Sequence, residues 1–130
     1  MKKILVVEDD PSTAAALSVR LRHGGYQTSI ARNAFQALMM AVHDRPDLLL
    51  LDIALPGQDG LHLAGSMKNF SITADIPIIF VTGSKDPHLR EKVMNVKAAG
   101  LLEKPYDPEE LLLMTQLAIE QPRPRPQHRA

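Results

Sequence analysis

Short apolar runs alternate along the chain with longer segments in which apolar residues recur every three or four positions. The runs at residues 48–51 and 76–81 are too short for a typical helix and almost unbroken, as expected for strands buried on both faces of a parallel sheet. Residues 4–7 form a third apolar run. The run at 26–31 is interrupted by polar residues, which predicts a strand at the sheet edge, and residues 101–102 predict a short fifth strand.

The segments between these strands carry the signals of helices. An acidic residue followed by proline is a typical N-cap and first helical residue. This pair occurs three times, at Asp10-Pro11, Asp86-Pro87 and Asp107-Pro108. Asn33 with Gln36 resembles a capping box, and Asp59 is a further candidate cap. The predicted helices lie at residues 11–23, 34–43, 60–70, 87–99 and 108–118. Because strand and helix alternate five times, we predict an α/β fold, a doubly wound five-stranded parallel sheet with helices on both faces.

Composition narrows the class of protein. A chain of 130 residues suits one compact domain, and the absence of cysteine excludes disulfides, thiolate metal sites and cysteine catalysis. No apolar segment is long enough to span a membrane, so we expect a cytoplasmic protein with no membrane partner.

The formal net charge of zero hides an uneven distribution. The ten C-terminal residues contain three arginines and no acid, so residues 1–120 carry a mild acidic excess, which argues against direct binding of nucleic acid by this part. We expect a single domain over residues 1–120. Residues 121–130, rich in proline and arginine, are expected to be a disordered tail or linker, with a docking segment as the open alternative.

Polar side chains follow four of the predicted strands, where parallel strands bring their carboxyl ends to one edge of the sheet. They are Glu8, Asp9, Asp52, Thr82 and Lys104. Two carboxylates about 4 Å apart repel by roughly 4 kcal/mol at an effective dielectric near 20, so a cluster of three needs a cation. Oxygen ligands of this kind suit a hard ion such as Mg²⁺. With the metal offsetting its charge, Asp52 could attack a phosphoryl group that Thr82 and Lys104 hold, giving an aspartyl phosphate.

The same residues carry a family resemblance over residues 2–120. The segments are VVEDD, LLLLDIALPGQDG, FVTGS and EKP, and in this order they resemble the receiver domain of bacterial two-component response regulators. The resemblance implies a flavodoxin-like sheet with strand order 2-1-3-4-5. It implies phosphorylation of Asp52 by a sensor histidine kinase or phosphotransfer protein. It further implies Mg²⁺ held by Glu8, Asp9, Asp52 and the Ala54 backbone carbonyl, and phosphoryl binding and switching by Thr82, Gly83 and Lys104.

Three positions depart from the family pattern. Leu101 stands where the family usually has an aromatic residue, so the ring that the family usually couples to the threonine is absent at this position. Lys97 stands where a glycine commonly ends the fourth helix. Ala54 offers no side-chain hydrogen bond to an attacking water, which predicts a changed lifetime of the phosphorylated state.

The sequence is also compatible with other functions. The main alternative is an interaction module of the same fold that ignores phosphate, for which Leu101 is the hint. A phosphatase with an aspartate nucleophile would need an acid at position 54, so we expect no enzyme beyond self-phosphorylation and slow dephosphorylation of Asp52. The expected partners are a kinase or phosphotransfer protein and a downstream effector or fused output domain. By resemblance, a homodimer is possible through the fourth helix, fifth strand and fifth helix.

Overall fold

The computed structural model describes residues 1–55 and 59–121. Within these ranges the chain forms a parallel sheet with strand order β2-β1-β3-β4-β5, which confirms the predicted doubly wound fold. The strands are Lys3–Val7 (β1), Gln27–Ala31 (β2), Leu48–Asp52 (β3), Ile78–Thr82 (β4) and Gly100–Glu103 (β5). The helices are Pro11–His23 (α1), Ala34–Asp44 (α2), Gly60–Lys68 (α3), Leu89–Asn95 (α4) and Pro108–Glu120 (α5).

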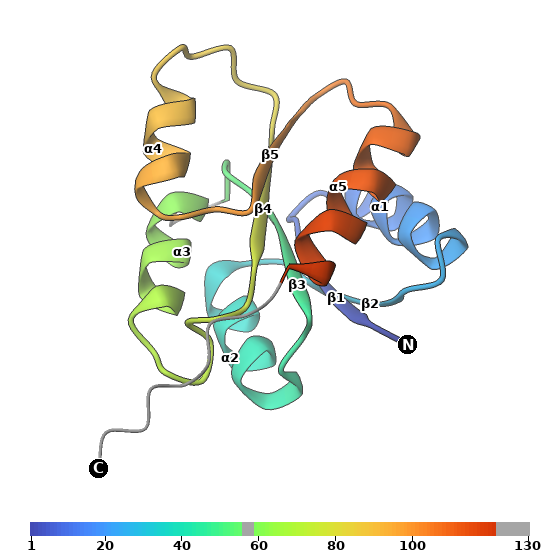
Figure 1. Cartoon of the computed structure of the whole chain (residues 1–130), viewed down its shortest axis with the longest axis horizontal. Coiled ribbons are helices and arrows are strands. Elements are labelled where there is room, and N and C mark those ends of the chain that lie inside the picture. Colours follow the sequence, from blue (N-terminus) through green and yellow to red (C-terminus); the bar gives the residue numbers. More distant parts are fainter. Residues whose placement is uncertain (56–58, 122–130) are drawn as a thin grey trace.

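The sheet separates two layers of helices, as Figure 1 shows: α1 and α5 lie on one face, and α2, α3 and α4 lie on the other. Alternate residues of β3 feed two apolar cores because successive side chains of a strand point to opposite faces. Leu48 and Leu50 pack with the α1 and α5 layer, and Leu49 and Leu51 pack with the other layer. Burial on both faces explains why this central strand is a continuous apolar run.

The strand register brings the carboxyl ends of the strands to one edge. Val7 pairs with Leu51, Asp52 with Val81, and Thr82 with Glu103. The polar residues that end these strands, or follow directly after them, therefore lie along a common border. This border carries the site described below.

Side-chain caps begin four of the helices as predicted. The carboxylate of Asp10 accepts from the Thr13 backbone N–H at 3.0 Å, and that of Asp59 accepts from His62 N–H at 2.8 Å. In the other two caps the Asn33 side chain accepts from the Gln36 backbone N–H at 2.9 Å, and the Asp107 carboxylate accepts from the Glu109 backbone N–H at 3.0 Å. Each side chain satisfies an N–H that has no partner within its helix.

The fourth helix was wrongly predicted to begin at Asp86-Pro87; it begins at Leu89. The Asp86 side chain accepts from the His88 backbone N–H at 2.9 Å, and the Ser84 hydroxyl accepts from Asp86 N–H at 3.1 Å. Ser84 and Asp86 therefore each bond to the backbone two residues further on and form turns. Their side chains are engaged in these turns and do not cap the helix.

Smaller differences concern element ends. β4 begins at Ile78 rather than at residue 76, because Pro77 has no N–H to donate to the sheet. α3 ends at Lys68, two residues earlier than expected. The predicted Pro56-Gly57 turn and residues 122–130 of the expected tail lie outside the described residues. No helix in the described part of the chain has the length and apolar character needed to cross a bilayer.

Candidate functional site

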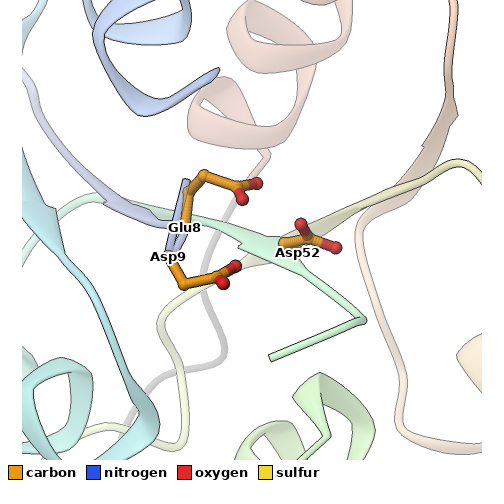
Figure 2. A group of neighbouring side chains, drawn as sticks. All are labelled: Glu8, Asp9 and Asp52. Atoms are coloured by element: carbon orange, nitrogen blue, oxygen red, sulfur yellow. The ribbon is translucent and has the colours of Figure 1, made fainter. Parts of the chain in front are cut away.

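Three carboxylates from two neighbouring strands meet at this edge of the sheet. Glu8 and Asp9 directly follow β1, and Asp52 is the last residue of β3. Figure 2 shows the three side chains directed into a shared space, and one carboxylate oxygen from each lies within 4.8 Å of the others. Glu8 and Asp52 are buried, with relative exposures of 3% and 8%, whereas Asp9 is exposed. The predicted acidic cluster is therefore present, with one side open to solvent.

Within the described residues, one ammonium group, that of Lys104, faces two of these carboxylates. Lys104 Nζ lies 3.8 Å from Asp52 Oδ2 and 4.0 Å from Glu8 Oε2. These are long ion pairs rather than short hydrogen bonds. One cation against three carboxylates leaves the cluster with an excess of negative charge.

The environment of Glu8 tests whether a metal ion would fit. Its Oε1 accepts from the Asp10 backbone N–H at 3.2 Å, but its buried Oε2 has no hydrogen-bond partner among residues 1–55 and 59–121. Burial, reinforced by the adjacent Asp52 carboxyl group, raises the pKa of Glu8 from 4.5 to about 7. A buried anionic oxygen without a donor, beside two more carboxylates, is an arrangement that a hard divalent cation would satisfy. The residues present therefore fit Mg²⁺.

Two backbone contacts position Asp52. The Ala54 N–H donates to Asp52 Oδ1 at 2.9 Å, and this fixes one carboxylate oxygen while Oδ2 faces Lys104. The first residue of α3, Gly60, packs directly on the end of β3: a Cβ placed there would lie 2.5 Å from the Asp52 carbonyl oxygen. The Gly60 N–H also donates to the Ile53 carbonyl at 2.8 Å. Sequence reasoning took Gly60 as a simple helix start and missed this role, which depends on a contact between separate elements.

The remaining predicted residues lie on the neighbouring strands. Thr82 ends β4, and its buried hydroxyl accepts from the Ser84 backbone N–H at 3.0 Å. The Thr82 carbonyl accepts from Lys104 N–H at 2.7 Å, which ties the two strand ends together. Gly83 is exposed next to Thr82. Leu101, in β5 beside Phe80, is half-buried and packs against the core on the α2, α3 and α4 side.

The structure adds a second lysine near this edge. Lys85, in the segment between β4 and α4, approaches the Lys104 carbonyl oxygen with its ammonium at 3.5 Å. Nothing in the sequence separates Lys85 from an ordinary exposed lysine, because the contact arises only from the adjacency of β4 and β5.

Comparisons with known proteins agree with this geometry. The chain is 37% identical over 111 residues to the phosphate regulon transcriptional regulatory protein PhoB of Pseudomonas aeruginosa, covering 85% of this chain and 48% of that protein. It spans about half the length of the curated relatives it matches.

Solved structures share the fold over most of the chain. A CheY-like response regulator receiver domain protein from Methanospirillum hungatei superposes with a TM-score of 0.85 at 27% identity, covering 92% of this chain and 94% of that one. The receiver domain of sensor histidine kinase PA1611 from Pseudomonas aeruginosa superposes with a TM-score of 0.84 at 28% identity, covering 92% and 98%, and holds a magnesium ion in its active site cleft. A family model, the response regulator receiver domain, matches residues 4–116. The chain therefore belongs to the receiver domain family of two-component response regulators.

Proposed function

We propose that this receiver domain accepts a phosphoryl group on Asp52 in a Mg²⁺-dependent reaction and thereby switches its contacts with other proteins. The observation that carries the proposal is the convergence of Glu8, Asp9 and Asp52 within 4.8 Å, with the Lys104 ammonium 3.8 Å from Asp52. A purely structural module has no reason to hold three repelling carboxylates together at the end of its sheet.

In this proposal a carboxylate oxygen of Asp52 attacks the phosphorus atom of the donor. The new O–P bond forms as the bond from phosphorus to the donor's leaving atom breaks, and the electron pair departs with the donor. Lys104 would bind an oxygen of the transferred group, and the Thr82 hydroxyl, which accepts from Ser84, keeps its proton for donation to another. Mg²⁺ held by Glu8, Asp9, Asp52 and the Ala54 carbonyl would offset the negative charge of the carboxylates and the phosphoryl oxygens. Gly83, with no side chain, would leave access for the phosphoryl group.

The proposed phosphodonor is a sensor histidine kinase or a phosphotransfer protein, acting in the cytoplasm. We assign residues 1–120 to the receiver domain and residues 121–130 to a tail or linker. Because the chain covers about half of its curated relatives, the output lies in a downstream effector or in a fused output domain. The mild acidic excess of residues 1–120 argues against direct contact with nucleic acid by this domain. The exposed apolar side chains of Met94, Leu113 and Leu117 support the α4, β5 and α5 face as a contact or homodimer surface.

The test is phosphorylation by acetyl phosphate. We expect the intact mass of the wild-type protein to increase by one phosphoryl group when Mg²⁺ is present and not when it is absent. Asp52→Asn should stay unmodified, because an amide oxygen is a poor nucleophile and a weaker metal ligand. An unmodified wild-type protein would instead favour the phosphate-independent interaction module suggested by Leu101.

A further inference from the structure

A cavity of about 690 Å³ lies at the edge of the sheet opposite to the acidic site. It is bordered by Pro77 and Ala99, which directly precede β4 and β5, whereas Asp52 and Thr82 lie at the other ends of the strands. Its walls come from α3, the segment before β4, the end of α4 and the end of α5. Its volume falls within the range of sites for small molecules.

Two lysines line this cavity from different elements. Lys68 is in the last turn of α3, and Lys97 follows α4. Asp75 also lines it, so the charged residues of the lining are two cations and one anion. Asn69, Asn95 and Gln121 also line the cavity, and residues of these types carry side-chain amides that can donate hydrogen bonds without a charge. This mixture of ammonium and amide donors suits an anion that has several oxygen atoms.

The ammonium group of Lys68 is poorly compensated. It is half-buried and donates to the Ala74 carbonyl oxygen at 3.3 Å, but within the described ranges no carboxylate lies within salt-bridge distance of it. Burial lowers the pKa of Lys68; Asp75 acts in the opposite sense and Lys97 adds to the lowering. An anion entering the cavity would restore the stabilisation that this charge lost on leaving water.

Lys97 provides an independent observation. Its backbone has a φ of 55°, in the left-handed region that glycine adopts at little cost and that a residue with a Cβ disfavours. The Lys97 N–H donates to the Met94 carbonyl at 2.9 Å as α4 ends. Glycine would suit the backbone of this turn better; the lysine instead adds a cationic side chain to the residues that line the cavity.

We propose that the cavity binds a small organic anion, a phosphate monoester or a dicarboxylate, through the ammonium groups of Lys68 and Lys97. The ligand would bridge the end of α3 and the turn that connects α4 to β5. The site is separate from the acidic cluster and does not depend on phosphorylation of Asp52.

The test is titration of the full chain, in buffer freed of divalent metals, with inorganic phosphate in one series and succinate in another, followed by amide chemical shifts. We expect saturable shifts at Lys68, Ala74 and Lys97 with at least one of the two probes, and the probe that binds identifies the class of anion. Lys68→Gln and Lys97→Gly should each weaken binding about tenfold, the loss expected for one charge-assisted contact. Lys92→Gln is the matched control, because Lys92 is an exposed lysine of α4 that does not line the cavity. The Lys92→Gln variant should bind the anion with wild-type affinity.

Two results would overturn the proposal: no saturable shift at the cavity with either probe, or equal affinity in wild type, Lys68→Gln and Lys97→Gly. Loss of folding does not confuse the result, because glycine suits the Lys97 backbone and should raise the melting temperature. Asp52→Asn should bind the anion with wild-type affinity. Failure of the phosphorylation experiment would therefore not contradict anion binding at the cavity. Failure of anion binding would not contradict phosphorylation of Asp52.

Discussion

Glu8 is a carboxylic acid whose surroundings disfavour its charge. Its buried Oε2 has no hydrogen-bond donor in the described part of the chain, and the pKa of Glu8 is raised to about 7 by burial and by Asp52. A divalent ion bound at this site would therefore compete with a proton near neutral pH. At the scale of single residues, this competition would couple metal binding to pH.

We predict that Mg²⁺ affinity falls as the pH is lowered through about 7, because the metal must then displace a proton from Glu8. Glu8→Gln should bind Mg²⁺ more weakly and lose this component of the pH dependence. Calorimetric titrations of both proteins at several pH values provide the measurement. An affinity that is independent of pH in the wild type would contradict the prediction.

The same pKa shift predicts how the stability of the metal-free protein depends on pH. A raised pKa means that the folded state holds its proton more tightly than the unfolded state. The contribution of Glu8 to the free energy of unfolding is therefore fully present below pH 4.5 and is lost as the pH rises through its folded-state pKa of about 7. In Glu8→Gln this part of the decline in stability with rising pH should be absent. Denaturant unfolding of both proteins at matched pH values measures the difference. An equal decline in both proteins would assign the effect to other groups.

At the scale of elements, the start of α3 and the end of β3 are packed backbone against backbone. We predict that Gly60→Ala destabilises the protein by about 1–3 kcal/mol, because its Cβ would lie 2.5 Å from the Asp52 carbonyl oxygen and 3.0 Å from Ile53 Cα. Movement of β3 away from α3 should also weaken Mg²⁺ binding. Both effects are measured by denaturant unfolding and metal titration.

Gly65 of the same helix is the matched control. A Cβ placed there meets no atom of the described residues within 4 Å, so Gly65→Ala should stabilise the protein by up to about 1 kcal/mol through the better helix propensity of alanine. Equal effects of the two substitutions would show that the contact at Gly60 does not position Asp52.

Two buried threonines form a second matched pair. Thr73 and Thr115 are both fully buried. The Thr73 hydroxyl donates to the Met67 carbonyl at 2.6 Å, whereas the Thr115 hydroxyl has no partner among the residues that the structure describes. We predict that Thr73→Val costs about 1 kcal/mol, because the Met67 carbonyl loses the hydroxyl and keeps the longer hydrogen bond from the Phe70 N–H, at 3.3 Å. Thr115→Val should be neutral or stabilising, because it removes an unsatisfied hydroxyl in exchange for a methyl group. Chemical denaturation of the two variants gives the comparison, and a larger loss at Thr115 would refute it.

At the scale of the whole molecule, the acidic edge should make stability depend on divalent metal. An ion that binds only the folded state stabilises it by about 2.7 kcal/mol when the free metal is roughly 100 times its dissociation constant. We predict that Mg²⁺ raises the melting temperature of the wild type and does so much less in Asp9→Asn, which removes an exposed ligand without disturbing the buried core. An equal rise in both proteins would mean that the stabilising ion binds elsewhere.

The sequence by itself determined the architecture and the chemical identity of the edge. Apolar runs such as residues 48–51 can be buried only between two layers, and an Asp-Pro pair such as Asp10-Pro11 caps a helix through contacts three residues away. Because parallel strands end at a common edge, the convergence of Glu8, Asp9 and Asp52 followed from topology alone.

Tertiary structure decided what depends on contacts between separate elements. Three features have no local signal in the sequence: the close approach of Gly60 to Asp52, the burial that raises the pKa of Glu8, and the meeting of Lys68 with Lys97 around one cavity. The start of α4 was misplaced because a local Asp-Pro pair serves a turn as well as a helix cap, and the hydrogen bonds of Ser84 and Asp86 selected the turn. The order of apolar and polar residues predicts which positions are buried. The distances between side chains of separate elements, and the desolvation of groups such as the Glu8 carboxyl, arise only when the chain has folded.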